Sequence, residues 1–242
     1  YCPDCNTVLE KGYTYWNEGN LTWKLDADGT LTISGTGAMK NYDYDNPSPA
    51  TQKKGSVKKV VIEKGVTSIG NSAFDSCSNL TSITIPKSVT SIEPYAFYNC
   101  TSLTSITIPK SVTSIGKYAF YNCSSLTSIT IPDSVTSIGE FAFYYCKSLT
   151  NITIPDSVTS IGKYAFSNCG RLTTISLSCG SALKKSDFGK QADLVSYTNQ
   201  HLLTKTAAKA PTCTEDGNKE YWTCEHCGKY FLSDDTNPET AK

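Results

Sequence analysis

Cysteines and a histidine near the C-terminus have the types and spacing of a tetrahedral zinc site. His201, Cys213, Cys224 and Cys227 are separated in turn by eleven, ten and two residues. A Cys-x-x-Cys pair with two further nitrogen or sulfur ligands can bind zinc, and four protein ligands would make the metal structural. The same spacing leaves two alternatives open: a disulfide from Cys224 to Cys213 or Cys227, and free thiols.

A pair of carboxylates suggests a second kind of chemistry. Asp133 and Asp156 stand 23 residues apart in matching sequence, and stacked coils would bring them to about 5 Å, the separation in a retaining glycosidase. The same column begins with Lys87 and Lys110, which favours a charged surface. Both histidines lie C-terminal to this region, so no Ser-His-Asp or Cys-His arrangement can form within it. We therefore predict no catalytic residues and no enzyme activity.

The elements that would position the two aspartates form a repeat of 23 residues. Residues 101–123 and 124–146 differ at only five positions. Further copies, the first and last of them degenerate, occupy residues 57–77, 78–100, 147–169 and 170–189. A fixed period of this length predicts stacked coils, each of which contacts mainly its neighbours.

The sequence of one coil predicts a short strand and a set of side chains that fill the core. Ile83-Thr84-Ile85 alternates inward and outward, and Pro86 ends the strand because it has no N–H group. The segment 116–123 predicts a short helical or irregular stretch on the opposite, convex side. Two columns are expected in the core, Phe74, Phe97, Phe120, Phe143 and Phe166, and Cys77, Cys100, Cys123, Cys146 and Cys169. Buried thiols of this kind should be inert and reduced.

The motif L-x-x-I-x-I-P, followed by S-V-T-S-I-G and A-F-x-x-C, resembles the BspA-like class of bacterial leucine-rich repeats over residues 57–189. One slot departs from the general leucine-rich consensus, because a serine stands where that consensus has asparagine. The serines are Ser88, Ser111, Ser134 and Ser157. They predict a hydroxyl ladder in place of an amide ladder. The resemblance implies a secreted or cell-surface bacterial protein used for adhesion or ligand binding.

The fold class that follows is a β-rich repeat solenoid of the leucine-rich type with a capping element at each end. Residues 1–15 are interpreted as the tail of a preceding Cys-x-x-Cys module, with a solvent-exposed terminal pair of Cys2 and Cys5 as the alternative, and 16–56 as an N-terminal β cap. Residues 57–189 are predicted to form about six coils, and 190–242 a C-terminal cap with a small Cys/His module. The segment TCTEDGNKEYWTCEHCGKYF resembles a module repeated in surface proteins of gut-type bacteria.

Two surfaces of the solenoid are candidates for binding a partner. One is a flat, polar and uncharged strand face with Thr84, Thr107, Thr130 and Thr153. The other is an aromatic column with Tyr95, Tyr118, Phe141 and Tyr164, since such rings contact proteins well and can stack on sugars. The alternative for the aromatic residues is packing between coils, and near-identical copies also suit a plain spacer.

Composition excludes some partners. The formal charge is zero, with 22 basic and 22 acidic residues, and Arg171 is the only arginine, so nucleic acid is an unsuitable partner. No apolar run reaches the roughly 20 residues that span a bilayer. We predict a monomeric, non-enzymatic adhesion, interaction or spacer segment of a larger protein at the bacterial cell surface. Its partner would be a protein or glycan on a host or neighbouring cell. The alternative is a glycan-binding accessory region of a secreted enzyme.

Overall fold

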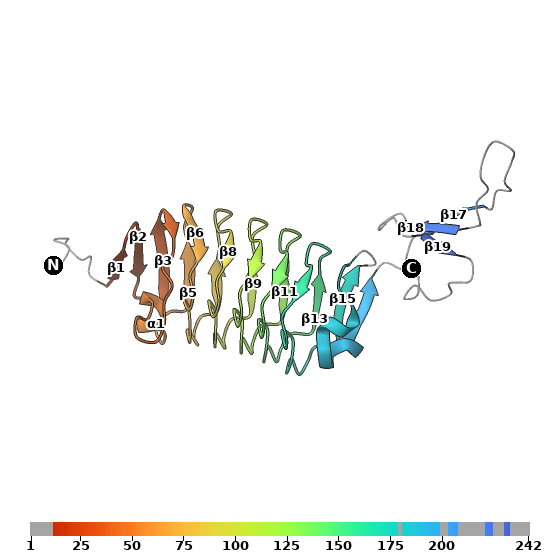
Figure 1. Ribbon diagram of the computed structural model, residues 1–242. Coiled ribbons are helices and arrows are strands. Elements are labelled where there is room, and N and C mark those ends of the chain that lie inside the picture. Colours follow the sequence, from red (N-terminus) through yellow and green to blue (C-terminus); the bar gives the residue numbers. More distant parts are fainter. Residues whose placement is uncertain (1–11, 179–180, 199–202, 208–220, 225–229, 233–242) are drawn as a thin grey trace.

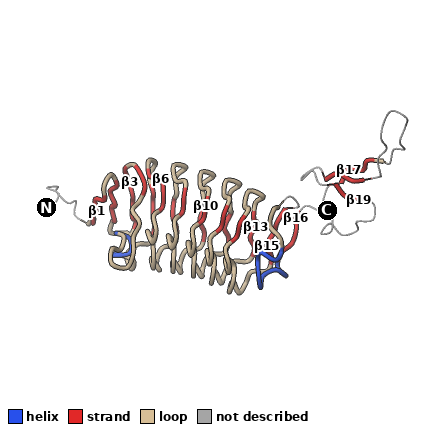
Figure 2. Tube along the Cα trace, in the orientation of Figure 1, coloured by secondary structure: helices blue, strands red, loops and turns tan. Residues whose placement is uncertain are grey.

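The computed structural model describes residues 12–178, 181–198, 203–207, 221–224 and 230–232. From Thr14 to Thr198 the chain winds into an elongated stack of coils, so the predicted solenoid is confirmed (Figure 1). Turns and loops make up most of each coil, and short strands line two of its sides (Figure 2). Among the described residues no helix has the length and apolar character needed to cross a membrane.

Each coil contributes one strand to each of two series. The first series is β5 (Lys59–Ile62), β7 (Ser82–Thr84), β9 (Ser105–Thr107), β11 (Ser128–Thr130), β13 (Asn151–Ile154) and β15 (Thr174–Ser178). The second series is β6 (Val66–Ile69), β8 (Ser91–Ile92), β10 (Ser114–Ile115), β12 (Ser137–Ile138) and β14 (Ser160–Ile161). A proline follows β7, β9 and β11 after one intervening residue and β13 directly, close to the predicted strand end, and the chain then turns into the second series. β5 and β15 are not followed by a proline.

Pairing between coils is parallel and keeps the repeat in register. In the second series the ladder runs unbroken from β4 (Gly37–Ala38) to β14, with Ser114 beside Ser91 and Ser137. The first series divides into separate ladders, β5 with β7, β9 with β11, and β13 with β15. Identical positions of the repeat therefore form straight columns along the stack.

An antiparallel β cap covers the N-terminal end of the stack. Its strands are β1 (Thr14–Glu18), β2 (Leu21–Leu25) and β3 (Thr30–Gly35), and β3 continues into the solenoid by pairing with β5. Trp23 is fully buried, with its ring 6.0 Å from that of Phe74 in the first coil. The cap thus extends the apolar core and shields the first coil's edge.

Two polar groups complete this cap. The Tyr42 hydroxyl donates a hydrogen bond to the Glu18 carboxylate, and burial raises the pKa of Tyr42 well above its usual value. Helix α1 (Pro49–Gln52) begins at Ser48, whose hydroxyl accepts a hydrogen bond from the Thr51 N–H at 3.0 Å. Serine is a favourable residue at this position because it satisfies a free helix amide.

Successive turns connected by hydrogen bonds between coils form the convex side. The N–H groups of Tyr95, Phe97 and Asn99 donate to carbonyl oxygens of the next coil at 2.8–3.0 Å. Tyr95 and Asn99 adopt a left-handed conformation, with φ of 57° and 56°. Because alternate amides point along the stack, every second residue of this segment is tied to the following coil. The predicted short irregular segment is therefore a regular ladder of turns.

The predicted core columns are confirmed. Phe97, Phe120 and Phe143 are fully buried, and their rings stack at 5.2 Å from coil to coil. The predicted serine ladder also forms, since the hydroxyls of Ser88 and Ser134 donate to carbonyls of the preceding coil at 2.7 and 2.6 Å. Ser157 is the exception, because its buried hydroxyl has no partner among the described residues.

Glycines at the start of the convex segment allow adjacent coils to approach closely. A Cβ at Gly139 would lie 2.4 Å from the backbone nitrogen of Lys117. We therefore expect Gly139→Ala to lower the free energy of unfolding by about 1–3 kcal/mol, the usual cost of overpacking. The control is Gly170→Ala, whose Cβ would meet no atom within 4 Å. Thermal melts check the prediction, and an unchanged Tm for Gly139→Ala would contradict it.

The C-terminal end of the stack departs from the repeat. The 3-10 helix η1 (Lys185–Leu194) follows β15, and β16 (Val195–Thr198) then pairs with β15 in parallel. Phe188 of η1 lies 6.3 Å from Phe166, ring to ring, and so continues the core column. A separate antiparallel sheet consists of β17 (Leu203–Thr206), β18 (Tyr221–Cys224) and β19 (Tyr230–Leu232).

Candidate binding surfaces of the solenoid

The threonines of the first-series strands form an exposed column. Thr107 and Thr130 are direct cross-strand neighbours, and so are Ser105 and Ser128 two residues earlier. All four predicted threonines, Thr84, Thr107, Thr130 and Thr153, are exposed. Together with the exposed Ser82, Ser105, Ser128 and Asn151 they define a polar surface that we call the strand face.

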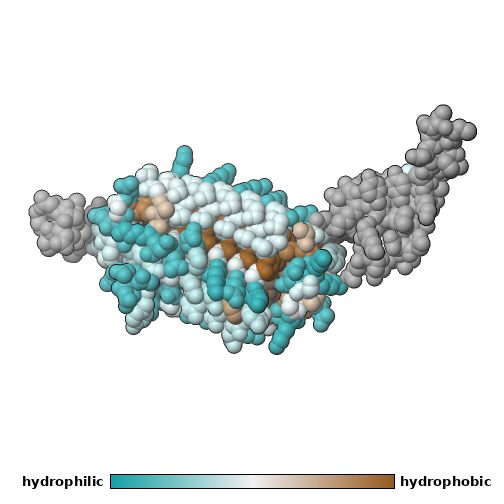
Figure 3. Space-filling view, in the orientation of Figure 1, coloured by the Kyte–Doolittle hydropathy of each residue, from teal (hydrophilic) through white to brown (hydrophobic). Residues whose placement is uncertain are grey.

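Isoleucines lie beneath this strand face and are not fully covered. Ile83 and Ile85 are half-buried, while Ile106 and Ile129 keep 6% and 7% of their surface exposed. The space-filling view shows an apolar stripe that crosses the coils between paler and more hydrophilic rows (Figure 3). Hydroxyl groups and apolar carbon are thus presented together, which suits contact with a polypeptide or a sugar.

The aromatic column is built by the convex ladder. Tyr95, Tyr118, Phe141 and Tyr164 all have positive φ, between 55° and 59°. Bulky residues seldom adopt this conformation, and it costs of order 1 kcal/mol for each of them. The amides of the first three donate to the next coil at 2.9–3.0 Å, which offsets the strain and holds the four side chains in one column.

Ring stacking covers most of the aromatic faces. Tyr118 stacks at 4.8 Å on Tyr95 and on Phe141, with interplanar angles of 9° and 5°. Tyr164 stacks less regularly on Phe141, at 5.1 Å and 31°, and is 55% exposed. An inner ring of this column therefore has no free face for a sugar, and only the end of the column can offer one.

A second aromatic column reinforces the first. Tyr98, Tyr121 and Tyr144 stack at 4.7 and 5.2 Å. Beside them the Asn122 amide donates to the Asn99 side-chain oxygen at 2.9 Å. The packing of rings between coils, which the sequence left as an alternative, is what the structure shows for both columns.

Charged side chains on the convex side pair across coils. Lys117 and Glu140 form an ion pair at 2.6 Å, and the hydrogen bond that the Lys117 ammonium donates to the Glu140 carboxylate raises the pKa of Lys117. Both side chains are largely accessible to solvent, so salt screens the interaction and its stabilising effect is small. This ion pair belongs to the sign-alternating column Lys117, Glu140 and Lys163.

The cysteine column has no accessible chemistry. Cys100, Cys123 and Cys146 are fully buried, and each thiol donates to a phenylalanine carbonyl of the preceding coil at 3.2 Å. Burial raises the pKa values of these thiols, and it raises those of Cys77 and Cys169 to about 12. All five cysteines of the column are unbonded to one another. They act as small apolar core residues.

The predicted zinc ligands cannot be compared with the structure. His201, Cys213 and Cys227 lie outside the described residues, and only the backbone of Cys224 is described, as the end of β18. Within the described ranges no group of three histidine, cysteine, aspartate or glutamate side chains could hold a metal ion. The structural zinc therefore stays a prediction.

Solved structures of bacterial repeat proteins resemble this one. The T. pallidum leucine rich repeat protein TpLRR matches 70% of this chain and 83% of its own, with 24% identity and a TM-score of 0.54. A leucine rich cell surface protein from Faecalibacterium prausnitzii matches 90% of this chain, with 29% identity and a TM-score of 0.51. The present chain spans 60% of that protein's length. No curated protein matches the sequence.

The family signature agrees with these structures. The BspA type leucine rich repeat region, in six copies, matches residues 48–173 and 113–210, which together cover more than half of the chain. Proteins of this repeat class generally work by contact with other molecules and not by catalysis. The chain belongs to the family of BspA type leucine rich repeat proteins.

Proposed function

We propose that this chain is a non-enzymatic interaction segment of a larger bacterial cell-surface protein, and that the strand face contacts its partner. The exposed column of Thr84, Thr107, Thr130 and Thr153 is the observation that carries the proposal. Repeat solenoids use extended surfaces of this kind for recognition. The name of the F. prausnitzii relative, a cell surface protein, supports the location.

The aromatic column is the weaker candidate for the same role. Stacking at 4.8 Å on both sides of Tyr118 leaves only ring edges for a partner. Threonines on the strand face, in contrast, can accept and donate hydrogen bonds without disturbing the core. The apolar stripe beneath them adds contact area that purely polar surfaces lack.

The test uses the double variant Thr107→Asp/Thr130→Asp, which places two negative charges on the strand face. Retention of the wild-type protein would be measured on immobilised extracellular-matrix proteins and on neutral polysaccharides. We expect binding to a matrix protein that the variant weakens by about tenfold or more, because desolvated carboxylates without partners are costly. The matched control is Thr113→Asp/Thr136→Asp, since these threonines are also exposed but precede the second-series strands.

The outcomes separate the candidate functions. Retention on a neutral polysaccharide, lost in Thr107→Asp/Thr130→Asp, would favour the accessory region of a secreted enzyme. Equal loss in both double variants would show that the strand face has no special role. No retention of the wild type on any of these surfaces would leave a spacer as the function.

A further inference from the structure

The convex ladder of hydrogen bonds ends one coil before the stack does. The Phe141 and Phe143 amides donate to the carbonyls of Lys163 and Ala165 at 3.0 and 2.8 Å. The equivalent amides one coil later belong to Tyr164 and Phe166, and these have no acceptor within the described part of the chain. By the geometry of the repeat, both N–H groups point along the stack toward η1.

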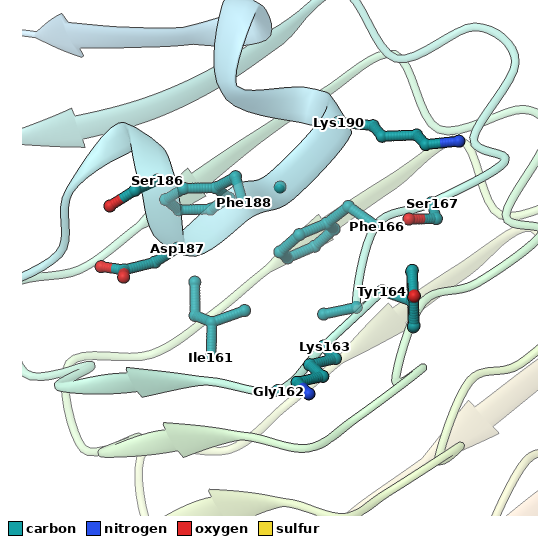
Figure 4. Close-up of a pocket in the computed structure, with 12 residues that line it drawn as sticks. Ile161, Gly162, Lys163, Tyr164, Phe166, Ser167, Ser186, Asp187, Phe188 and Lys190 are labelled. Atoms are coloured by element: carbon teal, nitrogen blue, oxygen red, sulfur yellow. The ribbon is translucent and has the colours of Figure 1, made fainter.

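A cavity lies where the next turn of the convex ladder would have stood. It has a volume of about 370 Å³ and is bounded by residues 161–167 of the last coil and 186–190 of η1. Phe166 and Phe188 line it from opposite sides, with Lys163, Tyr164 and Ser167 on the coil side (Figure 4). This volume is within the range of small-ligand sites.

Tyr164 contributes an aromatic surface to this cavity. It is the last ring of its column, so only Phe141 stacks on it, and 55% of its surface is exposed. The rings before it in the column, Tyr118 and Phe141, are covered on both faces by their neighbours. Tyr164 is therefore the ring of this column on which a sugar can stack next to free amide donors.

The charges around the cavity favour an anion. Lys163 and Lys190 both line it. Asp187 lines it as well, but its carboxylate already accepts a hydrogen bond from the Lys184 N–H at 2.8 Å. Two parallel backbone N–H groups without acceptors form the kind of concave donor site that binds carboxylates.

We propose that this cavity binds an acidic sugar, a hexose residue that carries a carboxylate. The carboxylate would accept hydrogen bonds from the Tyr164 and Phe166 amides, and the sugar ring would lie against the outer face of Tyr164. Lys163 and Lys190 would add attraction that weakens with salt. An acidic peptide could use the same amides, but the open ring beside them favours a sugar. The site lies at the end of the stack and is separate from the strand face.

The experiment is an NMR titration of the uniformly 15N-labelled protein. The probe is a tetrasaccharide of alternating glucuronic acid and N-acetylglucosamine, and the control ligand is the neutral N-acetylglucosamine tetrasaccharide. We expect the largest shift changes at the Tyr164 and Phe166 amides, with a Kd of about 0.1–1 mM for the acidic probe. The neutral control should bind at least about tenfold more weakly.

Variants test whether Tyr164 is the ring that contacts the sugar. Tyr164→Ala is expected to weaken binding by about tenfold, whereas Tyr95→Ala should leave the Kd within about twofold. Tyr95 is the matched control, because it ends the same column at the other end and has the same left-handed backbone, with φ of 57° against 59°. The doubly substituted Lys163→Met/Lys190→Met protein should bind more weakly and with less dependence on salt.

Several results would overturn the proposal. One is an acidic probe that shifts neither amide, or that binds Tyr164→Ala as tightly as the wild type. Equal affinity for the neutral tetrasaccharide would remove the role of the carboxylate. A glutamate-rich peptide that binds more tightly than the sugar would make the site a peptide site. Inorganic phosphate of equal affinity would reduce it to a simple anion site. Loss of strand-face binding in Thr107→Asp/Thr130→Asp has no bearing on these outcomes.

Discussion

Phe120→Ala is expected to lower the free energy of unfolding by about 3–5 kcal/mol, the usual cost of truncating a buried phenylalanine. Phe120 is fully buried and stacks at 5.2 Å on the rings of both neighbouring coils. Its removal would leave a cavity between Phe97 and Phe143, and neither ring can move to fill it without leaving its own column. A rigid repeat has few ways to relax around such a void.

Urea denaturation followed by circular dichroism measures the loss. The control is Thr107→Ala, which truncates an exposed side chain in β9 of the first strand series and should change stability by less than about 0.5 kcal/mol. Similar losses in the two variants would show that the inner and outer positions of the coil are assigned wrongly. A small loss for Phe120→Ala alone would show that the coils can close the gap.

The repeat was predictable from the sequence because one period fixes many positions at once. The alternation of Ile83-Thr84-Ile85, the following Pro86 and the phenylalanine and cysteine columns all predicted where the chain would lie, and the structure confirms them. The phenylalanine and cysteine columns each contain five copies of the same residue, and the proline column contains four. A position whose role is ambiguous in one copy is therefore assigned from the other copies, and an isolated strand offers no such comparison.

The convex side was predictable only in outline. A tyrosine in the sequence gives no sign that its φ is positive, and Tyr95 and Tyr118 adopt this unusual conformation because the next coil accepts hydrogen bonds from their amides. This is a tertiary effect that overrides local preference. The same effect determines which ring faces of the aromatic column are accessible. The ladder brings neighbouring rings to 4.8 Å and so covers the faces that a partner would need.

The cavity beside η1 was missed for a related reason. Where the repeat fades after residue 169, the sequence predicts only a degenerate coil. Phe188, 22 residues after Phe166, was a usable signal that the core column continues. The free amides of Tyr164 and Phe166 could not be foreseen, because they depend on a helix replacing the expected turn ladder.

The second large effect that we expect is loss of stability in mild alkali. Burial raises the pKa values of all five thiols in the cysteine column, to about 12 for Cys77 and Cys169. In the unfolded chain the same groups titrate near pH 8.5. Between about pH 9 and 12 the unfolded state therefore binds fewer protons than the native state. The stability is fully present below the unfolded pKa, and it falls as the pH rises.

The size of this effect follows from the number of thiols. Each contributes a slope of about 1.4 kcal/mol per pH unit, so five together give about 7 kcal/mol per unit. A domain with a typical total of about 5–15 kcal/mol would then unfold within one or two pH units above pH 9. Urea titrations at pH 7.0, 8.5 and 9.5 measure the slope before most tyrosines and lysines ionise.

Cys123→Ala separates this mechanism from general alkaline damage. The variant lacks one buried thiol, so its stability should fall about one fifth less steeply with pH than that of the wild type. Its stability at pH 7 will be lower because a core contact is lost, and for this reason the slopes and not the absolute values are compared. A native protein whose thiols react with iodoacetamide at pH 9 as fast as in urea would contradict the prediction. So would a stability that stays constant from pH 8.5 to 9.5, because either result requires thiols that titrate alike in the folded and unfolded states.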